Sequence, residues 1–528
     1  MEMREKVFIY DATLRDGAQG EGISFSDTAK VRFAHLLDDF GVDFIEGGFA
    51  GSNPRDQRFF QDIRKERFSH AHITAFGSTR RKDCDAKDDP QLAGLLAADT
   101  EWVTVYGKSW MLHVHDVLRT TGDNNIQMIA DTVGFLRAAS RRVFFDAEHF
   151  FDGYKDDPVY AMRALEAALR EGAEALVLCD TNGGSLPHEV FEITGKVCAA
   201  FPSVQIGIHN HNDSGLGVAT ALEGVRAGAR QVQGCINGYG ERTGNTNLIS
   251  VIPALELKMG FECVGPERLK KMREVSVVTD DLANQRPDPR QPYVGRSAFS
   301  HKAGAHVNAV QKNPRSFEHI APEAVGNRRN VLVSELSGAS NVLMKAAELG
   351  IEVDGLDKQQ AQAILEEVKR RENSGYSYES ADGSFKILLQ KVLNKHHPFF
   401  ELEGFRVIVE KRGRDEPCIS EATIKVKVKG VTELKAGEGD GPVDALNRAL
   451  REALTRFYPE IGDITLTDYR VRILDPKSAT RAMTRVLIES GDGKRHWNTV
   501  GVSENIIEAS WQALLDSIEY KLYEQRRG

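Results

Sequence analysis

The stretch EALVLCDTNGGSLPHEVFEITGKVCAAFPSVQIGIHNHND, residues 174–213, contains the pattern that decides the fold. It opens with a run of aliphatic residues that ends in Asp-Thr-Asn-Gly-Gly. A segment with apolar residues at helical spacing follows, with Pro187 near its first turn and Pro202 beyond its last, positions that suit the start and the end of a helix. A second strand-like run then ends in His-Asn-His. The stretch is therefore predicted to form a strand, a helix and a second strand.

The same alternation continues on both sides of this unit. Eight short runs rich in β-branched or aromatic residues are each followed by a stretch with helical spacing, and the runs span residues 6–14, 43–49, 72–79, 102–107, 141–150, 174–184, 205–213 and 230–240. Eight such units over roughly 260 residues match the length and order of an α/β fold of the (β/α)8 TIM barrel type. An open doubly wound sheet is the alternative, which the lack of a G-x-G-x-x-G motif after the first run disfavours.

The length of the chain predicts more than one domain. Its 528 residues exceed the size at which a single hydrophobic core stops growing. We expect a barrel domain at residues 1–262, connecting subdomains with a linker at 263–400, and a C-terminal domain at 401–528. In the last region strand-like runs surround the two helical stretches VDALNRALREALTRF and NIIEASWQALLDSIEYKL, a pattern typical of a compact α+β unit.

Charge and apolar pattern exclude several classes of protein. The formal net charge of -9 argues against nucleic-acid binding, which usually needs a basic excess. No segment offers roughly 20 uninterrupted apolar residues, and the N-terminus lacks the apolar core of a signal peptide. The six cysteines are scattered without a C-x-x-C pair, which indicates free thiols. We therefore expect a cytoplasmic protein with small-molecule partners and with neither a nucleic-acid nor a membrane partner.

Polar residues gather at the ends of the predicted strands. In a barrel of this kind the loops after the strands converge on one face, and the chemistry takes place there. The residues at those ends are Arg15, Asp16, Glu46, Glu148, Asp180, Thr181, His209, His211, Asn237 and Glu241. This set is the candidate site.

His209 and His211 are the strongest candidates for binding a metal ion. Side chains two residues apart on a strand point the same way, roughly 6.5 to 7 Å apart, so both imidazoles would face inward. With Asp16 as the best-placed carboxylate, they form a nitrogen and oxygen set that suits zinc, manganese, cobalt or, less well, magnesium. A hydrogen-bonded pair of core histidines is the alternative. His113 and His115 are a weaker rival pair, because they follow the fourth strand in a predicted loop or early helix.

Six motifs, in order, give the chain a resemblance to a known family. They are DATLRDGAQ (11–19), IEGGFAGSNPRD (45–56), DAEHFFDGYK (146–155), CDTNGG (179–184), HNHNDSGLG (209–217) and GCINGYGERTGN (234–245). By these motifs the chain resembles the metal-dependent acyl-CoA and 2-oxo-acid condensing enzymes, the family that contains isopropylmalate, homocitrate and citramalate synthases. The resemblance continues through SHKAGAHVNAV (300–310) and covers essentially the whole chain.

The resemblance implies a divalent metal and the substrates acetyl-CoA and pyruvate. A 2-oxo acid chelates a cation through its keto and carboxylate oxygens, which makes the ketone carbon electrophilic. By the same resemblance Arg15 would donate hydrogen bonds to the oxygen that gains charge, and Thr181 would hold the carboxylate of the oxo acid. The implied metal ligands are Asp16, His209 and His211, with Asn245 either binding the metal or supporting a ligand.

A base must also remove a proton from the methyl group of acetyl-CoA. The resemblance implies two candidates, Glu148 and His306, and the second would come from the segment after the barrel, from the same chain or a partner subunit. Simpler roles are an ion pair for Arg15, a helix N-cap for Thr181, a solvated carboxylate for Glu148 and a structural turn for His306. The sequence departs from the family at Phe317, where related synthases often carry tyrosine.

The C-terminal segment AGEGDGPVDAL (436–446) resembles the leucine-type regulatory domain of the same family. That likeness implies a homodimer inhibited by a branched-chain amino acid, isoleucine, whereas the simpler alternative is a glycine turn before a helix.

The sequence leaves other activities open. Isopropylmalate and homocitrate synthase remain alternatives, because the sequence does not give the size of the pocket that receives the side chain of the oxo acid. Related acyl-CoA lyases look to need a cysteine in the loop after the eighth strand, and GYGERTGN (238–245) contains none, which disfavours a lyase. An amidohydrolase would place H-x-H on the first strand, whereas here the pair follows the seventh. An amino-acid sensor without catalysis would leave the strand-end residues unexplained.

Overall fold

A computed structural model of the chain describes residues 4–51, 53–301, 304–331, 345–346, 358–378, 381–474, 482–493 and 495–526. The chain divides into two compact units. The first comprises Met1–Phe299 with His319–Arg329, and the second comprises Ser300–Glu318 with Asn330–Gly528. The connecting region 263–400 therefore contributes residues to both. No helix among the described residues is long and apolar enough to cross a membrane.

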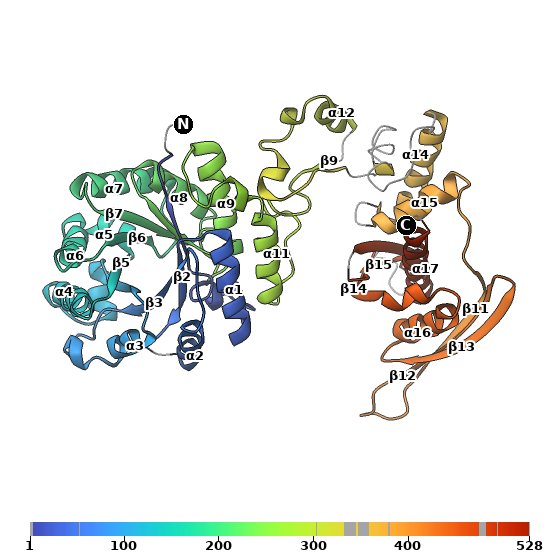
Figure 1. Cartoon of the computed structure of the whole chain (residues 1–528), viewed down its shortest axis with the longest axis horizontal. Helices are drawn as coiled ribbons and strands as arrows, with labels where there is room; N and C mark the ends of the chain where they lie inside the picture. The colour runs from blue at the N-terminus through green and yellow to red at the C-terminus, as the bar shows by residue number, and fades with distance from the viewer. Residues whose placement is uncertain are drawn as a thin grey trace. The chain divides into compact units, whose positions relative to one another are not determined.

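Eight parallel strands of the first unit close into a barrel (Figure 1). They are β1 (Phe8–Asp11), β2 (Phe44–Phe49), β3 (His72–Ser78), β4 (Trp102–Lys108), β5 (Arg142–Glu148), β6 (Ala175–Asp180), β7 (Gln205–Asn210) and β8 (Gln231–Gly234). On β1, Tyr10 lies opposite Phe44 of β2 and opposite Gln233 of β8, and this double pairing closes the sheet. Each strand overlaps one of the eight predicted runs, so the prediction of a TIM barrel is confirmed.

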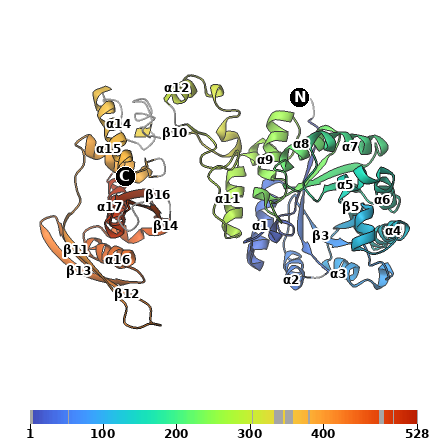
Figure 2. The same cartoon turned by 180° about the vertical axis from the view of Figure 1, so that it is seen from behind.

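Helices cover the outside of the barrel (Figure 2). They are α1 (Asp27–Phe40), α2 (Pro54–Ile63), α3 (Pro90–Ala98), α4 (Gly122–Ala138), α5 (Phe150–Asp156), α6 (Pro158–Arg170), α7 (Pro187–Ala200), α8 (Gly217–Arg226) and α9 (Leu248–Ala254), followed by α10 (Pro266–Leu269) and α11 (Met272–Leu282). Local chemistry sets their ends. In α1 the hydroxyl of Ser26 accepts a hydrogen bond from the Ala29 N–H at 3.1 Å, and Gly41, with φ of 92°, ends the helix.

The barrel interior changes from apolar to polar along the strands. Inward-facing side chains recur every second residue, and β5 shows the change: Phe144 packs in an aromatic cluster, whereas Asp146 and Glu148 line a cavity. The aromatic residues of that cluster, which we call the aromatic plug, are Tyr10, Phe44, Trp102 and Phe144. The plug fills the barrel near the start of the strands and leaves their carboxyl ends to polar groups.

Replacing Phe144 by alanine is expected to lower the free energy of unfolding by about 3 to 5 kcal/mol, the usual cost of removing a buried aromatic ring. Phe144 is 1% exposed, and its ring centre lies 4.6 Å from that of Trp102 and 4.9 Å from that of Phe44. Urea titration of the purified variants checks this. Val159→Ala, at a side chain that is 71% exposed, is the control and should cost less than about 0.5 kcal/mol. Equal losses would contradict the stabilising role of the plug.

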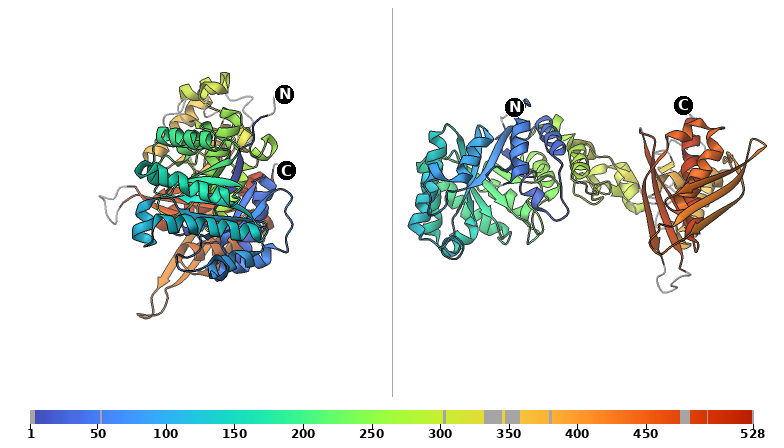
Figure 3. Two further views of the ribbon diagram at one scale, coloured as in Figure 1. Left: turned by 90° about the vertical axis from the view of Figure 1, so that its left-hand side faces the viewer. Right: turned by 90° about the horizontal axis from the view of Figure 1, so that it is seen from below.

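The described residues of the second unit form two three-stranded antiparallel sheets and one short parallel strand pair. Its first elements are β9 (Ser300–His301), α12 (Gly304–Lys312), β10 (Asn330–Val331), α14 (Lys358–Asn373) and α15 (Asp382–Val392). One sheet then consists of β11 (Glu401–Glu410), β12 (Ile419–Val428) and β13 (Val431–Gly439), followed by α16 (Pro442–Thr455). The other consists of β14 (Thr465–Ile473), β15 (Thr484–Gly491) and β16 (His496–Ser503), followed by α17 (Ile506–Gln525). Seen from below, the strands of this unit lie on either side of its helices (Figure 3). Helices packed against antiparallel sheets are typical of the α+β class.

The strand β13 is not among the strand-like runs predicted from the sequence, where a glycine turn before a helix is the simpler interpretation of residues 436–446. Its side chains alternate between exposed and half-buried, so no clear apolar face marks it as a strand. Pairing with β12 defines it, with Thr423 opposite Ala436. Its glycine serves packing as well, because a Cβ at Gly437 would lie 2.7 Å from the backbone nitrogen of Ala449 in α16.

Candidate active site

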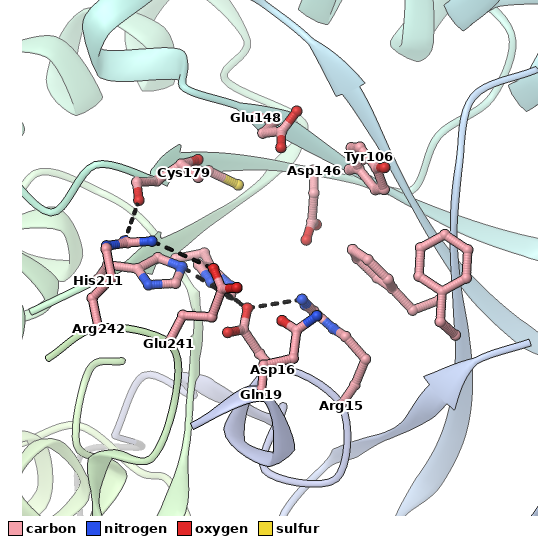
Figure 4. Close-up of a pocket in the computed structure, with 14 residues that line it drawn as sticks. Arg15, Asp16, Gln19, Tyr106, Asp146, Glu148, Cys179, His211, Glu241 and Arg242 are labelled. Atoms are coloured by element: carbon pink, nitrogen blue, oxygen red, sulfur yellow. Dashed lines mark hydrogen bonds and ion pairs between the residues drawn. The ribbon is translucent and has the colours of Figure 1, made fainter. Parts of the chain in front are cut away.

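A cavity of about 220 Å³ opens at the carboxyl ends of the barrel strands. Figure 4 shows its polar side chains converging from several strands. The lining residues are Arg15, Asp16, Gln19, Phe49, Phe76, Tyr106, Asp146, Glu148, Cys179, Thr181, His209, His211, Glu241 and Arg242. Most of the strand-end candidates therefore meet in one place, whereas Glu46, Asp180 and Asn237 are not part of the lining.

Three side chains in this cavity are placed to bind one metal ion. Asp16 Oδ2 lies 3.6 Å from His209 Nε2 and 3.9 Å from His211 Nε2, and the possible ligand atoms all lie within 4.8 Å of one another. Atoms bound to one cation at about 2.2 Å are at most about 4.4 Å apart. A small adjustment therefore brings all three to a single ion. Among the described residues, this is the group of three possible ligands that lies so close together.

Burial and neighbouring charges favour the protonation states that metal binding needs. Burial alone would raise the pKa of the Asp16 carboxyl, but Arg15 and the two histidines hold that pKa well below its usual value. Burial, together with the neighbouring His209, lowers the pKa of His211 to about 4. Near pH 7 the carboxylate is therefore ionised and the His211 imidazole is neutral, which are the forms that bind metals.

Asn245 contacts this group through its side-chain amide. Its Nδ2 donates to Asp16 Oδ1 at 2.9 Å and to the Tyr239 carbonyl at 3.1 Å. Its Oδ1 is buried and has no hydrogen-bond partner among the described residues, which leaves an oxygen for a cation or a substrate. The contact needs a glycine beside it, because Gly240 has φ of 151° and a Cβ there would lie 2.3 Å from Asn245 Nδ2. Asn245 therefore supports Asp16 through Nδ2, and direct metal binding through Oδ1 stays a prediction.

Arg15 is held beside the metal group by three contacts. Its Nε donates to Glu46 Oε2 at 2.7 Å, and its Nη1 donates to Asp16 Oδ2 at 2.8 Å. Its guanidinium carbon lies 3.8 Å from the centre of the Phe76 ring. No hydrogen bond among the described residues uses Nη2, so both N–H groups of that nitrogen are left to donate to a substrate oxygen. Arg15 thus forms the simpler ion pair and also faces the cavity.

Glu148 ends β5 and pairs with a cation that the sequence analysis did not single out. Its carboxylate, 22% exposed, forms an ion pair with Lys108 at the end of β4. The next residue, His149, has φ of 57°, and its N–H donates to the Thr181 hydroxyl at 3.0 Å. Thr181 therefore joins the end of β6 to the end of β5. Helix α7 begins later, at Pro187, so Thr181 is not its N-cap.

His306 lies in the second unit, on α12. Its ring stacks on that of Phe317, with centres 4.2 Å apart, and both side chains are exposed. Phe317 therefore supplies an apolar surface to His306. The role of His306 as a base stays a prediction.

The rival pair His113 and His115 does not form a two-histidine site in the structure. Both residues lie in a π-helical turn, His113–Val117, where a spacing of two points side chains in different directions. His113 instead packs against His149, with ring centres 4.1 Å apart, and stacks on Trp110. His115 is exposed. Neither histidine lines the cavity described above.

Sequence reasoning missed several lining residues. They are Gln19, Phe49, Phe76, Tyr106, Asp146, Cys179 and Arg242. Asp146 had a usable signal, because it stands two residues before Glu148 on one strand and so faces the same way. Burial, together with the charge of Glu46, raises the pKa of Asp146 to about 8. The cavity therefore contains a carboxyl group that is largely protonated near pH 7.

Three family models match successive parts of the chain. The model described as HMGL-like matches residues 6–277, the one described as homocitrate synthase post-HMGL domain-like matches 293–375, and the LeuA allosteric (dimerisation) domain matches 379–522. The HMGL-like match includes the whole barrel and every residue that lines the cavity. The chain belongs to the HMGL-like family.

Curated relatives indicate which kind of enzyme within the HMGL-like family this chain is similar to. The chain is 52% identical over 521 residues to an (R)-citramalate synthase of Aquifex aeolicus, covering 98% of each chain. It is 52% identical over 517 residues to that of Geobacter sulfurreducens, again covering 98% of each, and 49% identical over 531 residues to that of Synechocystis, covering 98% of this chain and 96% of the relative. The protein is thus an acyltransferase-type condensing enzyme, similar over nearly its whole length to citramalate synthases.

Solved structures also resemble the chain. HMG-CoA lyase of Brucella melitensis is 19% identical with a TM-score of 0.46, covering 53% of this chain and all of the lyase chain. Hydroxymethylglutaryl-CoA lyase of Pseudomonas aeruginosa is 16% identical with a TM-score of 0.46, covering 54% of this chain and 96% of the lyase chain.

Proposed function

We propose that this enzyme condenses acetyl-CoA with pyruvate and hydrolyses the thioester, releasing citramalate and CoA. The observation that carries the proposal is the identity of 46 to 52% to proteins named (R)-citramalate synthase, over 98% or more of the chain. The site contains the groups that such a reaction needs: a metal-binding set, a guanidinium and a carboxylate around one cavity. The reaction would be the first step of a route from pyruvate to isoleucine.

A divalent cation fits the residues present. Asp16, His209 and His211 would hold it, with Asn245 supporting Asp16. The Oδ1 of Asn245 is buried and meets no donor in the described part of the chain, which points to a missing cationic or donor partner. Zinc, manganese, cobalt and magnesium remain candidates. When bound, such an ion acts as a Lewis acid that polarises a carbonyl group.

The protein's own residues would orient the reactants and move the protons. Arg15 donates to the ketone oxygen of pyruvate as negative charge develops on it, and Thr181 binds the carboxylate of pyruvate. Glu148 takes a proton from the acetyl methyl group, whose carbon then bonds to the ketone carbon as the C=O π bond breaks, and the former ketone oxygen gains a proton from water while Glu148 returns its proton to the solvent. Water then displaces CoA from the thioester. His306 is the second candidate for the base.

The acceptor is tested by the release of CoA with three oxo acids. We expect kcat/KM for pyruvate to exceed that for 2-oxoisovalerate and 2-oxoglutarate by at least about 100-fold, because a pocket that fits a methyl group excludes larger side chains. Preference for 2-oxoisovalerate would make the enzyme an isopropylmalate synthase, and preference for 2-oxoglutarate a homocitrate synthase. Either result would overturn the proposal while leaving the family unchanged.

The C-terminal domain would regulate this activity. Residues 379–522 match the LeuA allosteric (dimerisation) domain, which supports a homodimer and an amino-acid effector. A product pathway that ends in isoleucine makes isoleucine the expected effector, acting as a feedback inhibitor. The same CoA-release assay, run with added isoleucine, tests this regulation.

A further inference from the structure

Three buried side chains form a hydrogen-bonded chain across the barrel interior. His209 Nδ1 lies 2.8 Å from Gln233 Oε1, and Gln233 Nε2 donates to Asp146 Oδ1 at 3.1 Å. The three residues come from β7, β8 and β5, and each is at most 5% exposed. Asp146 points into the cavity from its strand (Figure 4). These two hydrogen bonds therefore connect one of the three possible metal ligands, His209, to the wall of the cavity.

The direction of these hydrogen bonds indicates which ring nitrogen of His209 carries a hydrogen. An amide NH2 can only donate, and a carboxyl carbonyl oxygen accepts. Because Gln233 gives its NH2 to Asp146, its amide oxygen faces His209 and requires a donor. Nδ1 of His209 then donates the hydrogen, so Nε2 is the nitrogen whose lone pair is available to a metal ion. Nε2 is the atom that lies 3.6 Å from Asp16 Oδ2, at the proposed metal position.

We propose that Gln233 and Asp146 are positioning residues that hold His209 in the tautomer and ring orientation required to bind the metal. The inference rests on the proposed function, since it concerns the same metal site. Partners on the far nitrogen of a histidine ligand commonly act in this way, and their loss costs about 10- to 100-fold in metal affinity. Here the amide sets the tautomer and the carboxyl sets the orientation of the amide.

His211 gives a contrast within the same site. Its Nδ1 is buried and has no hydrogen-bond partner among the described residues, so no comparable group fixes its ring. His209 is therefore the histidine whose geometry the barrel sets in advance. The metal group then consists of one preset imidazole, one imidazole without such a partner, and a carboxylate held by Arg15 and Asn245.

The chain offers a matched control on the same strand. Gln231 stands two residues before Gln233, is 0% exposed, and neither its Oε1 nor its Nε2 has a hydrogen-bond partner among the described residues. Leucine is similar in size to glutamine, so the substitution removes one buried amide group at either position. Only Gln233→Leu removes the partner of His209, so a difference between the two variants reports that contact rather than the loss of a buried amide.

The test is a titration of the metal-free full-length proteins with Co²⁺, followed by the visible absorption of the bound ion. We expect Gln233→Leu to bind about 10- to 100-fold more weakly than the wild type, with an altered absorption band, and Gln231→Leu to bind like the wild type. Equal Co²⁺ affinity in the wild type and Gln233→Leu would overturn the inference. Wild-type protein that bound no Co²⁺ would instead overturn the metal site of the proposed function.

A second pair of variants keeps the inference testable if Gln233→Leu does not fold. Asp146→Asn retains a carbonyl oxygen for the Gln233 NH2, whereas Asp146→Ala removes it. We expect Co²⁺ affinity near that of the wild type for Asp146→Asn and at least about threefold weaker for Asp146→Ala, a smaller loss than at Gln233 because the contact is one step more remote. Equal affinities in these two variants would contradict the positioning role of Asp146.

Discussion

Replacing Asp16 by alanine is expected to lower kcat/KM for CoA release by at least about 10³-fold. Lewis-acid stabilisation of the developing charge contributes several kcal/mol, and each 1.36 kcal/mol is a factor of ten in rate. The change removes one metal ligand and also one of the two carboxylates that pair with Arg15, leaving only Glu46 at 2.7 Å among the described residues. The positive charge of Arg15 would then be less fully balanced beside the incoming cation. Initial rates over a range of pyruvate concentrations, at saturating metal, measure the effect.

Metal removal provides the matching test on the unaltered enzyme. Chelator-treated wild-type protein should lose turnover and regain it when a divalent cation is added, whereas Asp16→Ala should show little recovery. Asp62→Asn is the control, because this carboxylate is 51% exposed and pairs with Lys65 on the surface. It should retain the wild-type rate within about twofold, since such pairs contribute little. Full activity in chelated wild-type enzyme would exclude a metal-assisted reaction.

Replacing Glu148 by glutamine is expected to slow turnover by about 10² to 10⁴-fold, the usual contribution of a positioned base. Glutamine preserves the shape of the side chain and its place beside Lys108 but accepts no proton. The direct measurement is exchange of the acetyl methyl hydrogens of acetyl-CoA with deuterated water, which isolates proton removal from the later steps. Exchange should disappear in Glu148→Gln together with CoA release.

Two further variants identify the base. Glu241→Gln alters another carboxylate that lines the cavity and should retain exchange. His306→Ala tests the second candidate, and it should slow turnover without abolishing exchange if Glu148 is the base. Exchange that persists in Glu148→Gln and vanishes in His306→Ala would reverse the assignment.

The barrel could be predicted because its signal is repeated eight times. Each strand combines a short β-branched or aromatic run with a following helical pattern, so an error in one unit would leave the others to define the fold. β13 had no such support. Its residues, 431–439, alternate between exposed and half-buried positions, and they became recognisable as a strand only through pairing with β12.

The site could be predicted only in part. Strand-end position and a spacing of two identified Asp16, His209 and His211, which the structure brings together. Gln233 was missed because a glutamine within a strand has no distinctive pattern, and its partner on β5 depends on how the strands are staggered around the barrel. The sequence of one strand does not specify that stagger. Contacts between distant strands, such as that of Gln233 with Asp146, therefore required the structure.

The aromatic plug has a practical consequence for protein engineering. Its rings stabilise the barrel from a level below the cavity, and the plug shares no residue with the cavity lining. Acceptor preference can therefore be redesigned by mutagenesis of half-buried rim residues such as Phe49 and Tyr106 while the floor of the barrel stays intact. A variant library restricted to that rim would sample new substrates with little loss of folded protein.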